Sequence, residues 1–145
     1  MPEIYKGVVF MVDYITGING AGKTRILSEA AAATAQISKG NVIFIDSTDK
    51  LEKILPSSIR FINISDYSID GAMSLCGFLL GLCAGDYDLT DIFIDSTTSI
   101  VSPKETNLND FFEILTKASE KTGVSFHFSV LDDYATELIY QSQAE

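Results

Sequence analysis

The residues from Gly17 to Thr24 have the types and the spacing that phosphate binding requires. In order they are Gly17, Ile18, Asn19, Gly20, Ala21, Gly22, Lys23 and Thr24, which matches G-x-x-x-x-G-K-[ST] at every fixed position. Glycines let the backbone curve without Cβ clashes, so that successive N–H groups can point at phosphate oxygens. The pattern therefore predicts a phosphate-binding loop.

The last residues of this loop predict a nucleoside triphosphate with Mg²⁺. The Lys23 side chain supplies a compact positive charge for the β- and γ-phosphates, and the Thr24 hydroxyl is placed one residue later to ligate the metal. An incidental lysine in a glycine-rich turn is the weaker alternative, because a strand pattern precedes the loop and a helix pattern follows it. Arg25 comes next, and either contacts a phosphate or the base or points to solvent from the first helical turn.

Two aspartates are candidates for the carboxylate that completes such a metal site. Asp46 and Asp95 end nearly identical phrases, Ile43-Phe44-Ile45-Asp46-Ser47-Thr48 and Ile92-Phe93-Ile94-Asp95-Ser96-Thr97. Parallel strands that end at one cleft explain this similarity more simply than an internal repeat does. A carboxylate at a strand tip beside the loop helps to hold Mg²⁺ on the phosphates.

Strands alternating with helices are expected to position these residues. Apolar runs rich in Ile, Val or Phe predict buried parallel strands at Val8–Thr16, Val42–Asp46, Arg60–Ser65, Ile92–Asp95 and Val124–Val130. Because Asp13 does not suit a buried central strand, the first strand proper is expected at Val12–Thr16, with Asp13 near its lower end. The prediction is an α/β fold of about five mainly parallel strands, with helices on both faces and ligands at the carboxyl ends of the strands.

Helix patterns lie between most of these strands. The clearest is an amphipathic stripe, which Gly123 is expected to end, made of Leu108, Phe111, Phe112, Leu115 and Ala118. The others are Lys23–Ser38, closed by a left-handed Gly40, then Asp70–Ala84, which ends at Gly85, and a weaker pattern at Asp133–Tyr140.

The composition predicts one compact domain, 1–145, because 145 residues with 46% hydrophobic content suffice for a single core. Residues 1–10 are interpreted as a peripheral extension, with Met11 as an alternative native start. Twenty acidic side chains against ten basic ones give a net charge of −10, which disfavours nucleic acid and anionic membranes. The most apolar stretch, 72–84, is shorter than the roughly 20 residues of a membrane span. A cytoplasmic protein is therefore expected.

Three residues that often carry chemistry are interpreted as structural. Cys76 and Cys83 lie on one predicted helix, where a rise of about 1.5 Å per residue separates them by roughly 10 Å and prevents a disulfide. Both are expected to be free, buried thiols in a reducing compartment. His127 lies in an apolar strand without a second metal ligand nearby in sequence, which favours a hydrogen-bonded histidine.

The chain resembles the ATPase core of RecA-type recombinases over about residues 12–130. Besides the loop, the phrases that carry the resemblance are 40–46, 61–65 and 91–96 with Ile100. The resemblance implies that Asp95 is the Walker B residue, which holds Mg²⁺ directly or through water. It leaves Asp46 as the second choice of ligand, and a solvated strand end or a helix cap is the favoured interpretation of that residue.

Departures from this family predict slow hydrolysis, or none by the chain alone. Thr48 stands where the resemblance places a water-activating glutamate, and 129–132 read Ser-Val-Leu-Asp where a recombinase has a glutamine sensor. The DNA-binding loops have no counterpart. The chain is also similar to small stand-alone bacterial P-loop proteins, some of them labelled twitching-motility or pilus-retraction ATPases. The histidine-bearing motifs of a pilus motor are not found, so motility is not expected.

Three functional hypotheses follow. The first is an ATP-binding protein with weak or partner-dependent hydrolysis; ATP rather than GTP follows from the family and from the lack of an Asn/Thr-Lys-x-Asp phrase. The second is a non-catalytic, nucleotide-dependent regulatory or assembly subunit, for which Thr48 is the main support. The third and weakest is a small-molecule kinase, whose lid would need arginines when the chain has only Arg25 and Arg60. A homo-oligomer or an unidentified protein partner is compatible with the first two.

Overall fold

The computed structural model describes residues 5–9, 12–17, 22–95, 97 and 108–131. Its strands form one sheet in the order β1-β2-β6-β5-β3-β4. The strands are β1 Tyr5–Val9, β2 Val12–Gly17, β3 Asn41–Asp46, β4 Ile59–Asn63, β5 Leu89–Ile94 and β6 Ser125–Leu131. The helices are α1 Lys23–Ile37, α2 Ala72–Gly85 and α4 Leu108–Thr122, with a short 3₁₀ helix, η1, at Ile64–Tyr67.

Five strands, β2-β6-β5-β3-β4, are parallel, which confirms the predicted α/β fold with a parallel sheet. The first strand proper is confirmed, because the predicted Val12–Thr16 corresponds to β2, Val12–Gly17. The apolar run from Val8 to Thr16 belongs to two antiparallel strands, because Val9 pairs with Val12 and Tyr5 pairs with Thr16. Of the residues interpreted as a peripheral extension, 5–9 therefore form an edge strand of the sheet.

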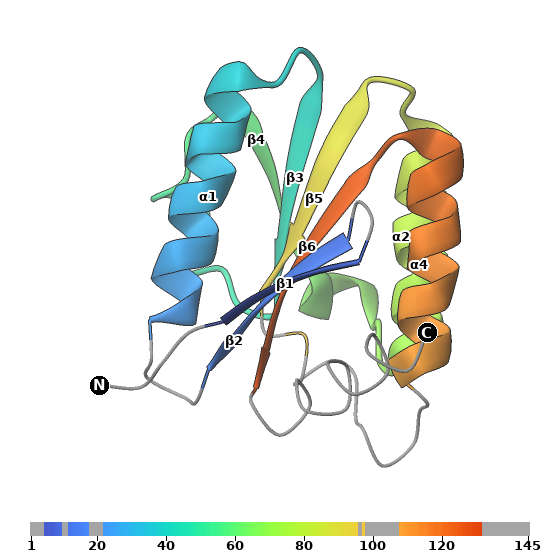
Figure 1. Cartoon of the computed structure of the whole chain (residues 1–145). Coiled ribbons are helices and arrows are strands. Elements are labelled where there is room, and N and C mark those ends of the chain that lie inside the picture. The colour runs from blue at the N-terminus through green and yellow to red at the C-terminus, as the bar shows by residue number, and fades with distance from the viewer. Residues whose placement is uncertain (1–4, 10–11, 18–21, 96, 98–107, 132–145) are drawn as a thin grey trace.

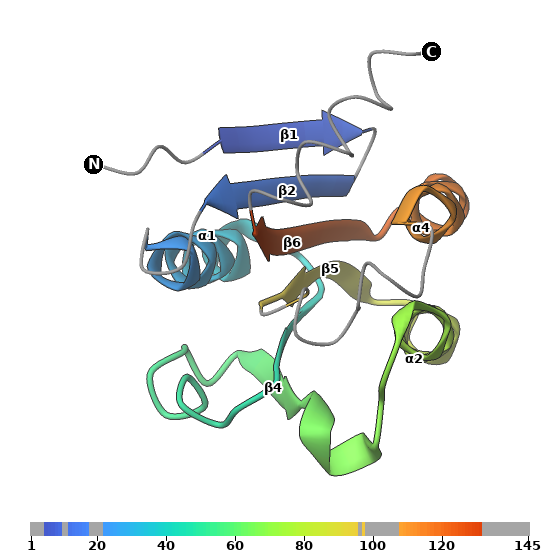
Figure 2. The same ribbon diagram turned by 90° about the horizontal axis from the view of Figure 1, so that it is seen from below.

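The sheet lies between two helical layers, with α1 on one face and α2 and α4 on the other (Figures 1 and 2). The α1 face buries a cluster that includes Ile15, Leu27, Phe44 and Phe93. The opposite face buries a larger cluster around Phe126, Phe128, Phe111, Leu115, Leu75 and Leu79. Because side chains alternate along a strand, β6 presents its phenylalanines to α2 and α4 and its His127 and Ser129 to the α1 face.

The helix predictions are confirmed to within two residues at each end. On α4, the stripe residues Phe111, Phe112 and Leu115 are buried. Gly123 follows α4 with a φ of 79°, as expected of the residue that ends it. The weak helix pattern at Asp133–Tyr140 lies outside the described residues.

Gly40 has a different role from the one predicted, because it does not adopt a positive φ. A Cβ on this residue would collide with the Asp88 carbonyl oxygen and would lie 2.9 Å from Thr90 Cγ2. The neighbouring Asn41 N–H donates to the same Asp88 carbonyl at 2.7 Å, so the two backbones cross here with no room for a side chain.

Gly40→Ala is accordingly expected to lower the free energy of unfolding by about 1–3 kcal/mol, the usual cost of overpacking. Chemical denaturation measures this value. The matched control is Gly81→Ala on α2, where a new Cβ would meet nothing within 4 Å. That change should be neutral or stabilising by up to about 1 kcal/mol, because alanine has the better helix propensity. Equal effects of the two changes would contradict the close approach.

The two cysteines are free and buried, as predicted. Burial raises the pKa of the Cys76 thiol to about 11, so that it stays protonated and unreactive at neutral pH. Within the described part of the chain, no helix combines the length and the apolar character needed to cross a membrane.

Candidate functional site

The end of β2 and the start of α1, which flank the predicted loop, lie at the edge of the sheet where the parallel strands end (Figure 1). Gly17 is the last residue of β2, and Gly22 is the N-cap of α1, with φ 91° and ψ 19°. Only glycine adopts this left-handed conformation without strain. Residues 18–21, predicted to form the middle of the loop, lie outside the described residues. The strand–loop–helix context of the motif is therefore present at both ends.

Lys23 spans the loop from its far end. The Nζ atom donates a hydrogen bond to the carbonyl oxygen of Gly17 at 2.9 Å, so the side chain reaches back from the first turn of α1 to the end of β2. The N-terminus of α1 adds the backbone N–H groups of its first turn and the positive end of the helix dipole. Positive charge and backbone donors thus converge on the loop, which suits a bound anion.

Asp95 follows β5 and lies beside the start of α1. Its Oδ2 accepts a hydrogen bond from the Thr24 hydroxyl at 2.8 Å. Its backbone N–H donates to the Ile45 carbonyl on β3 at 2.9 Å, which fixes the position of the carboxylate on the neighbouring strand. The residue is only 4% exposed. Two of the predicted metal-site residues, 71 positions apart in sequence, are therefore in direct contact.

The oxygens of Thr24 and Asp95 are a donor set that suits Mg²⁺. This small, hard cation prefers carboxylate and hydroxyl oxygens in octahedral geometry and keeps several waters. In the structure, the Thr24 hydroxyl and Asp95 Oδ2 lie within hydrogen-bond distance of each other beside the start of α1. The residues present are compatible with the predicted metal.

Asp46 is not the solvated strand end or helix cap that the sequence favoured. It is 5% exposed, and turns rather than a helix follow it. Ile45 pairs with Ile94, so Asp46 and Asp95 end neighbouring strands, and side-chain alternation places both on the α1 face. The Oδ1 atom of Asp46 accepts a bond from the Ser47 N–H at 2.7 Å. Burial at the site keeps Asp46 a candidate metal ligand.

Ser129 is a site residue that the sequence analysis missed. Its hydroxyl donates to Asp95 Oδ1 at 2.6 Å, and the side chain is 3% exposed. The signal was present in the strand pattern. Along β6, His127 and Ser129 alternate with phenylalanines, and polar residues at such spacing share one face. The two aspartates of the segment Asp91–Asp95 share a face in the same way.

Arg25 does not join the site. Its guanidinium lies 3.8 Å from the Glu29 carboxylate one helical turn away, and its side chain is 74% exposed. The solvent-exposed alternative is therefore the observed one. Thr48 is exposed as well. Of the predicted residues, the structure brings together Gly17, Lys23, Thr24 and Asp95.

A second polar cluster crosses three strands on the same face of the sheet, nearer the amino ends of the strands. His127 Nδ1 lies 2.7 Å from Asp13 Oδ1, and His127 Nε2 lies 2.8 Å from Asp91 Oδ1. The Phe93 ring stacks on the imidazole with a centroid distance of 4.2 Å. His127 is thus the hydrogen-bonded strand histidine that was predicted, and Asp13 is accommodated in β2 because it has this partner.

The charge state of this cluster follows from its contacts. Burial alone would lower the pKa of His127, but the hydrogen bonds and charges of Asp13 and Asp91 outweigh burial and raise it from 6.5 to about 9. Burial alone would raise the pKa of Asp91, but the hydrogen bonds from His127 and Thr90 and the charge of His127 lower it. At neutral pH the imidazole is therefore a cation between two carboxylates.

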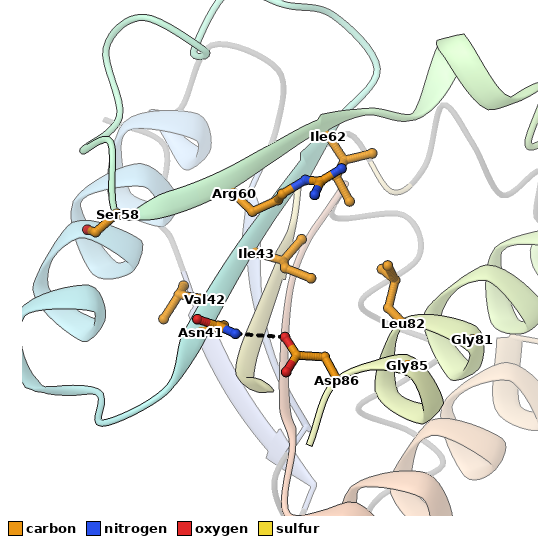
Figure 3. A pocket seen from close by; sticks show the side chains of 10 residues that line it. All are labelled: Asn41, Val42, Ile43, Ser58, Arg60, Ile62, Gly81, Leu82, Gly85 and Asp86. Atoms are coloured by element: carbon orange, nitrogen blue, oxygen red, sulfur yellow. Dashed lines mark hydrogen bonds between the residues drawn. The ribbon is translucent and has the colours of Figure 1, made fainter. Parts of the chain in front are cut away.

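A pocket of about 440 Å³ lies elsewhere, between α2 and the strands β3 and β4 (Figure 3). Arg60 and Ile62 line it from β4, and Gly81 and Leu82 line it from α2. At one end, the Asn41 amide donates to the Asp86 carboxylate at 2.8 Å. Asn41 begins β3, whereas Asp95 follows the end of β5, so the pocket is separate from the loop site.

A scan against protein-family models found no match to this chain, and a search of curated proteins found no significant match. The fold is established as α/β with a parallel sheet of five strands. Because one fold hosts many functions, the function is argued from the site residues.

Proposed function

We propose that this chain binds ATP with Mg²⁺ through the loop Gly17–Thr24, with a RecA-like P-loop arrangement and weak or partner-dependent hydrolysis. The observation that carries the proposal is the 2.8 Å contact between the Thr24 hydroxyl and Asp95 Oδ2. A loop motif alone predicts a phosphate site. The buried carboxylate of Asp95, hydrogen-bonded to the Thr24 hydroxyl, adds a second oxygen ligand for a metal bound to the triphosphate.

Each residue has a defined part in binding. The Lys23 ammonium donates a hydrogen bond to the Gly17 carbonyl at 2.9 Å. From this position it would reach the oxygens of a phosphate bound in the loop. The N–H groups of the first turn of α1 would donate to the same oxygens. Thr24 and Asp95 would hold Mg²⁺, which neutralises charge on the β- and γ-phosphates when bound. The low exposure of Asp95 strengthens its attraction for a cation.

Weak hydrolysis is supported by the residues beside the metal site. Phosphoryl transfer depends on an oriented water and on charge stabilisation. Thr48, at the position expected for a water-activating carboxylate, is an exposed threonine that cannot accept a proton at neutral pH. Asp46, the carboxylate that ends β3, accepts a hydrogen bond from the Ser47 N–H at its Oδ1. The site therefore suits the binding of a triphosphate better than its hydrolysis.

The same observation favours a second candidate, a regulatory or assembly subunit that uses the nucleotide to order its surface. This candidate shares the binding step and differs only in lacking turnover. A kinase is less well supported, because Arg25 faces Glu29 and Arg60 lines the separate pocket. Phosphate release over hours by the purified protein would favour the first candidate over the second.

Asp95→Asn tests the metal assignment. In Mg²⁺, the dissociation constant for ATP should rise about tenfold or more, because an amide oxygen is a poor substitute for a buried carboxylate ligand. In EDTA the constant should not change. Isothermal titration calorimetry under both conditions measures this, with the exposed Asp88→Asn at the other end of β5 as the charge-matched control. Equal weakening by Asp95→Asn in EDTA would take the metal role away from Asp95.

A further inference from the structure

We propose that Ser129 is a positioning residue, which holds the Asp95 carboxylate in the orientation that presents Oδ2 to the metal. This inference rests on the proposed function, because it assigns a role within the same site. It goes further in giving β6, which contributes no residue of the loop motif, a direct part in cation binding.

The register of the sheet places Ser129 beside Asp95. Strand β6 lies between β2 and β5, with Ser129 opposite Ile15 on one side and Phe128 opposite Ile94 on the other. The next residue pair along β5 and β6 is therefore Asp95 and Ser129. Both residues are almost fully buried, at 4% and 3% exposure. Their contact is set by the backbone of two neighbouring strands and needs no long side chain.

The two carboxylate oxygens of Asp95 have different partners. Oδ1 accepts from Ser129 at 2.6 Å, and Oδ2 accepts from Thr24 at 2.8 Å. A short bond from a hydroxyl to a carboxylate is among the stronger hydrogen bonds in proteins. The terminal torsion of an aspartate has a broad minimum, so a bond at one oxygen decides where the other points. The Ser129 bond directs Oδ2 toward the first turn of α1.

Only one of these two hydroxyls belongs to the predicted metal site. Thr24 is the first-turn residue of the motif, and its oxygen is itself a candidate ligand. Ser129 donates to Oδ1 of Asp95, the oxygen that does not contact Thr24. It would therefore act on the metal through Asp95. Partners that hold a ligating carboxylate in this way typically change metal affinity by about 10–100-fold when removed.

A merely structural role predicts something different. If Ser129 served only as a hydrogen-bond donor to a buried carboxylate, replacing it would lower the free energy of unfolding. It would have no selective effect on ATP affinity in Mg²⁺. The chain offers a matched comparison in Ser119 on α4, which is fully buried and donates to the Val124 carbonyl at 2.6 Å. Ser119→Ala removes a hydroxyl of similar burial and equal hydrogen-bond length, away from the loop.

The experiment compares ATP affinity in Mg²⁺ and in EDTA for the full chain and its variants. The measured quantity is the ratio of the dissociation constant in EDTA to that in Mg²⁺. Ser129→Ala is expected to lower this ratio about tenfold or more, with the EDTA value unchanged. Ser129→Thr keeps the hydroxyl on a strand-compatible side chain and should recover most of the ratio. Ser119→Ala should leave the ratio at the wild-type value.

A double variant shows whether Ser129 acts through Asp95. In the Asp95→Asn background, Ser129→Ala should cause no further fall in the ratio, because residues that act as a unit are not additive. An additive fall would overturn the positioning role. So would a Ser129→Ala protein that binds ATP in Mg²⁺ as the wild type does. If wild type itself binds no ATP under either condition, the proposed function fails, and that result is distinct from wild-type binding without a Ser129 effect.

Discussion

Lys23→Ala is expected to weaken the binding of ATP at least about a hundredfold, a loss of roughly 2.7 kcal/mol or more. The side chain starts on the first turn of α1, and its Nζ lies 2.9 Å from the Gly17 carbonyl at the other end of the loop. It is therefore the positive charge that spans the loop. A point charge on the β- and γ-phosphates contributes most where the surrounding site is partly buried. Calorimetric titration in Mg²⁺ measures the loss.

Lys39→Ala is the matched control for this change. Lys39 is exposed and follows the other end of α1, about 20 Å away at 1.5 Å per helical residue. It alters the net charge of the chain by the same amount, so it corrects for general electrostatic attraction. The control should bind as the wild type does. A Lys23→Ala protein with wild-type affinity, or equal losses in both variants, would contradict the loop assignment.

The stability of the fold is expected to fall as the pH rises from about 6.5 to about 9. The pKa of His127 is raised from 6.5 to about 9 by Asp13 and Asp91, against the effect of burial. A group with a raised pKa stabilises the folded state fully below its unfolded value, and this contribution is lost as pH rises through the folded value. The shift corresponds to roughly 3 kcal/mol, an upper estimate because solvent screens Asp13.

The same cluster sets the acid side of the profile. The pKa of Asp91 is lowered below 3.8, so its contribution is present above that value and is lost as the pH falls through the folded value. Stability from this cluster is therefore greatest between the two regions. Urea unfolding from about pH 2 to about pH 9.5 covers both pH regions.

His127→Gln tests the origin of the alkaline arm. Glutamine keeps hydrogen-bonding capacity between the two strands but carries no charge, so the loss of stability between pH 6.5 and pH 9 should disappear. At pH 6 both His127→Gln and His127→Ala should be less stable than the wild type by about 3 kcal/mol, because each leaves Asp13 and Asp91 without the cation. An unchanged alkaline arm in His127→Gln would show that another group causes it.

Local patterns in the sequence predicted the layers of the fold well. Parallel strands buried on both faces read as continuous apolar runs, and helices with one buried face show a 3.6-residue stripe. These signals located β3, β5, β6 and α4. The loop motif gave the strand–loop–helix order around Gly17 and Gly22. All of these features depend on residues that are close together in sequence.

The errors concern contacts between distant residues. The apolar run before the loop does not reveal that the chain reverses direction between β1 and β2. Both strands are apolar where they meet, at Val9 and Val12. Gly40 was interpreted from its place after a helix, whereas its role comes from the crossing of Asp88. The role of Ser129 also depends on a contact with a residue that is distant in sequence. Its partner Asp95 is 34 residues away, and only the order β6-β5 in the sheet brings them together.

Asp46 illustrates how burial changes the meaning of a residue. In the sequence, an aspartate before Ser-Thr at a strand end suits solvent or a helix cap. In the fold, the neighbouring strands and α1 leave it 5% exposed beside Asp95. In the proposed function, two carboxylates at adjacent strand tips would supply oxygen ligands for a cation. Chain order alone does not reveal which strand tips are neighbours.

The most direct test of the central claim is a titration of the wild-type chain with ATP, in Mg²⁺ and in EDTA, followed by calorimetry. The proposed function predicts saturable binding of one ATP per site, with a smaller dissociation constant in Mg²⁺, because Thr24 and Asp95 then contribute through the metal. Folded protein that takes up no ATP at millimolar concentration under either condition would contradict it.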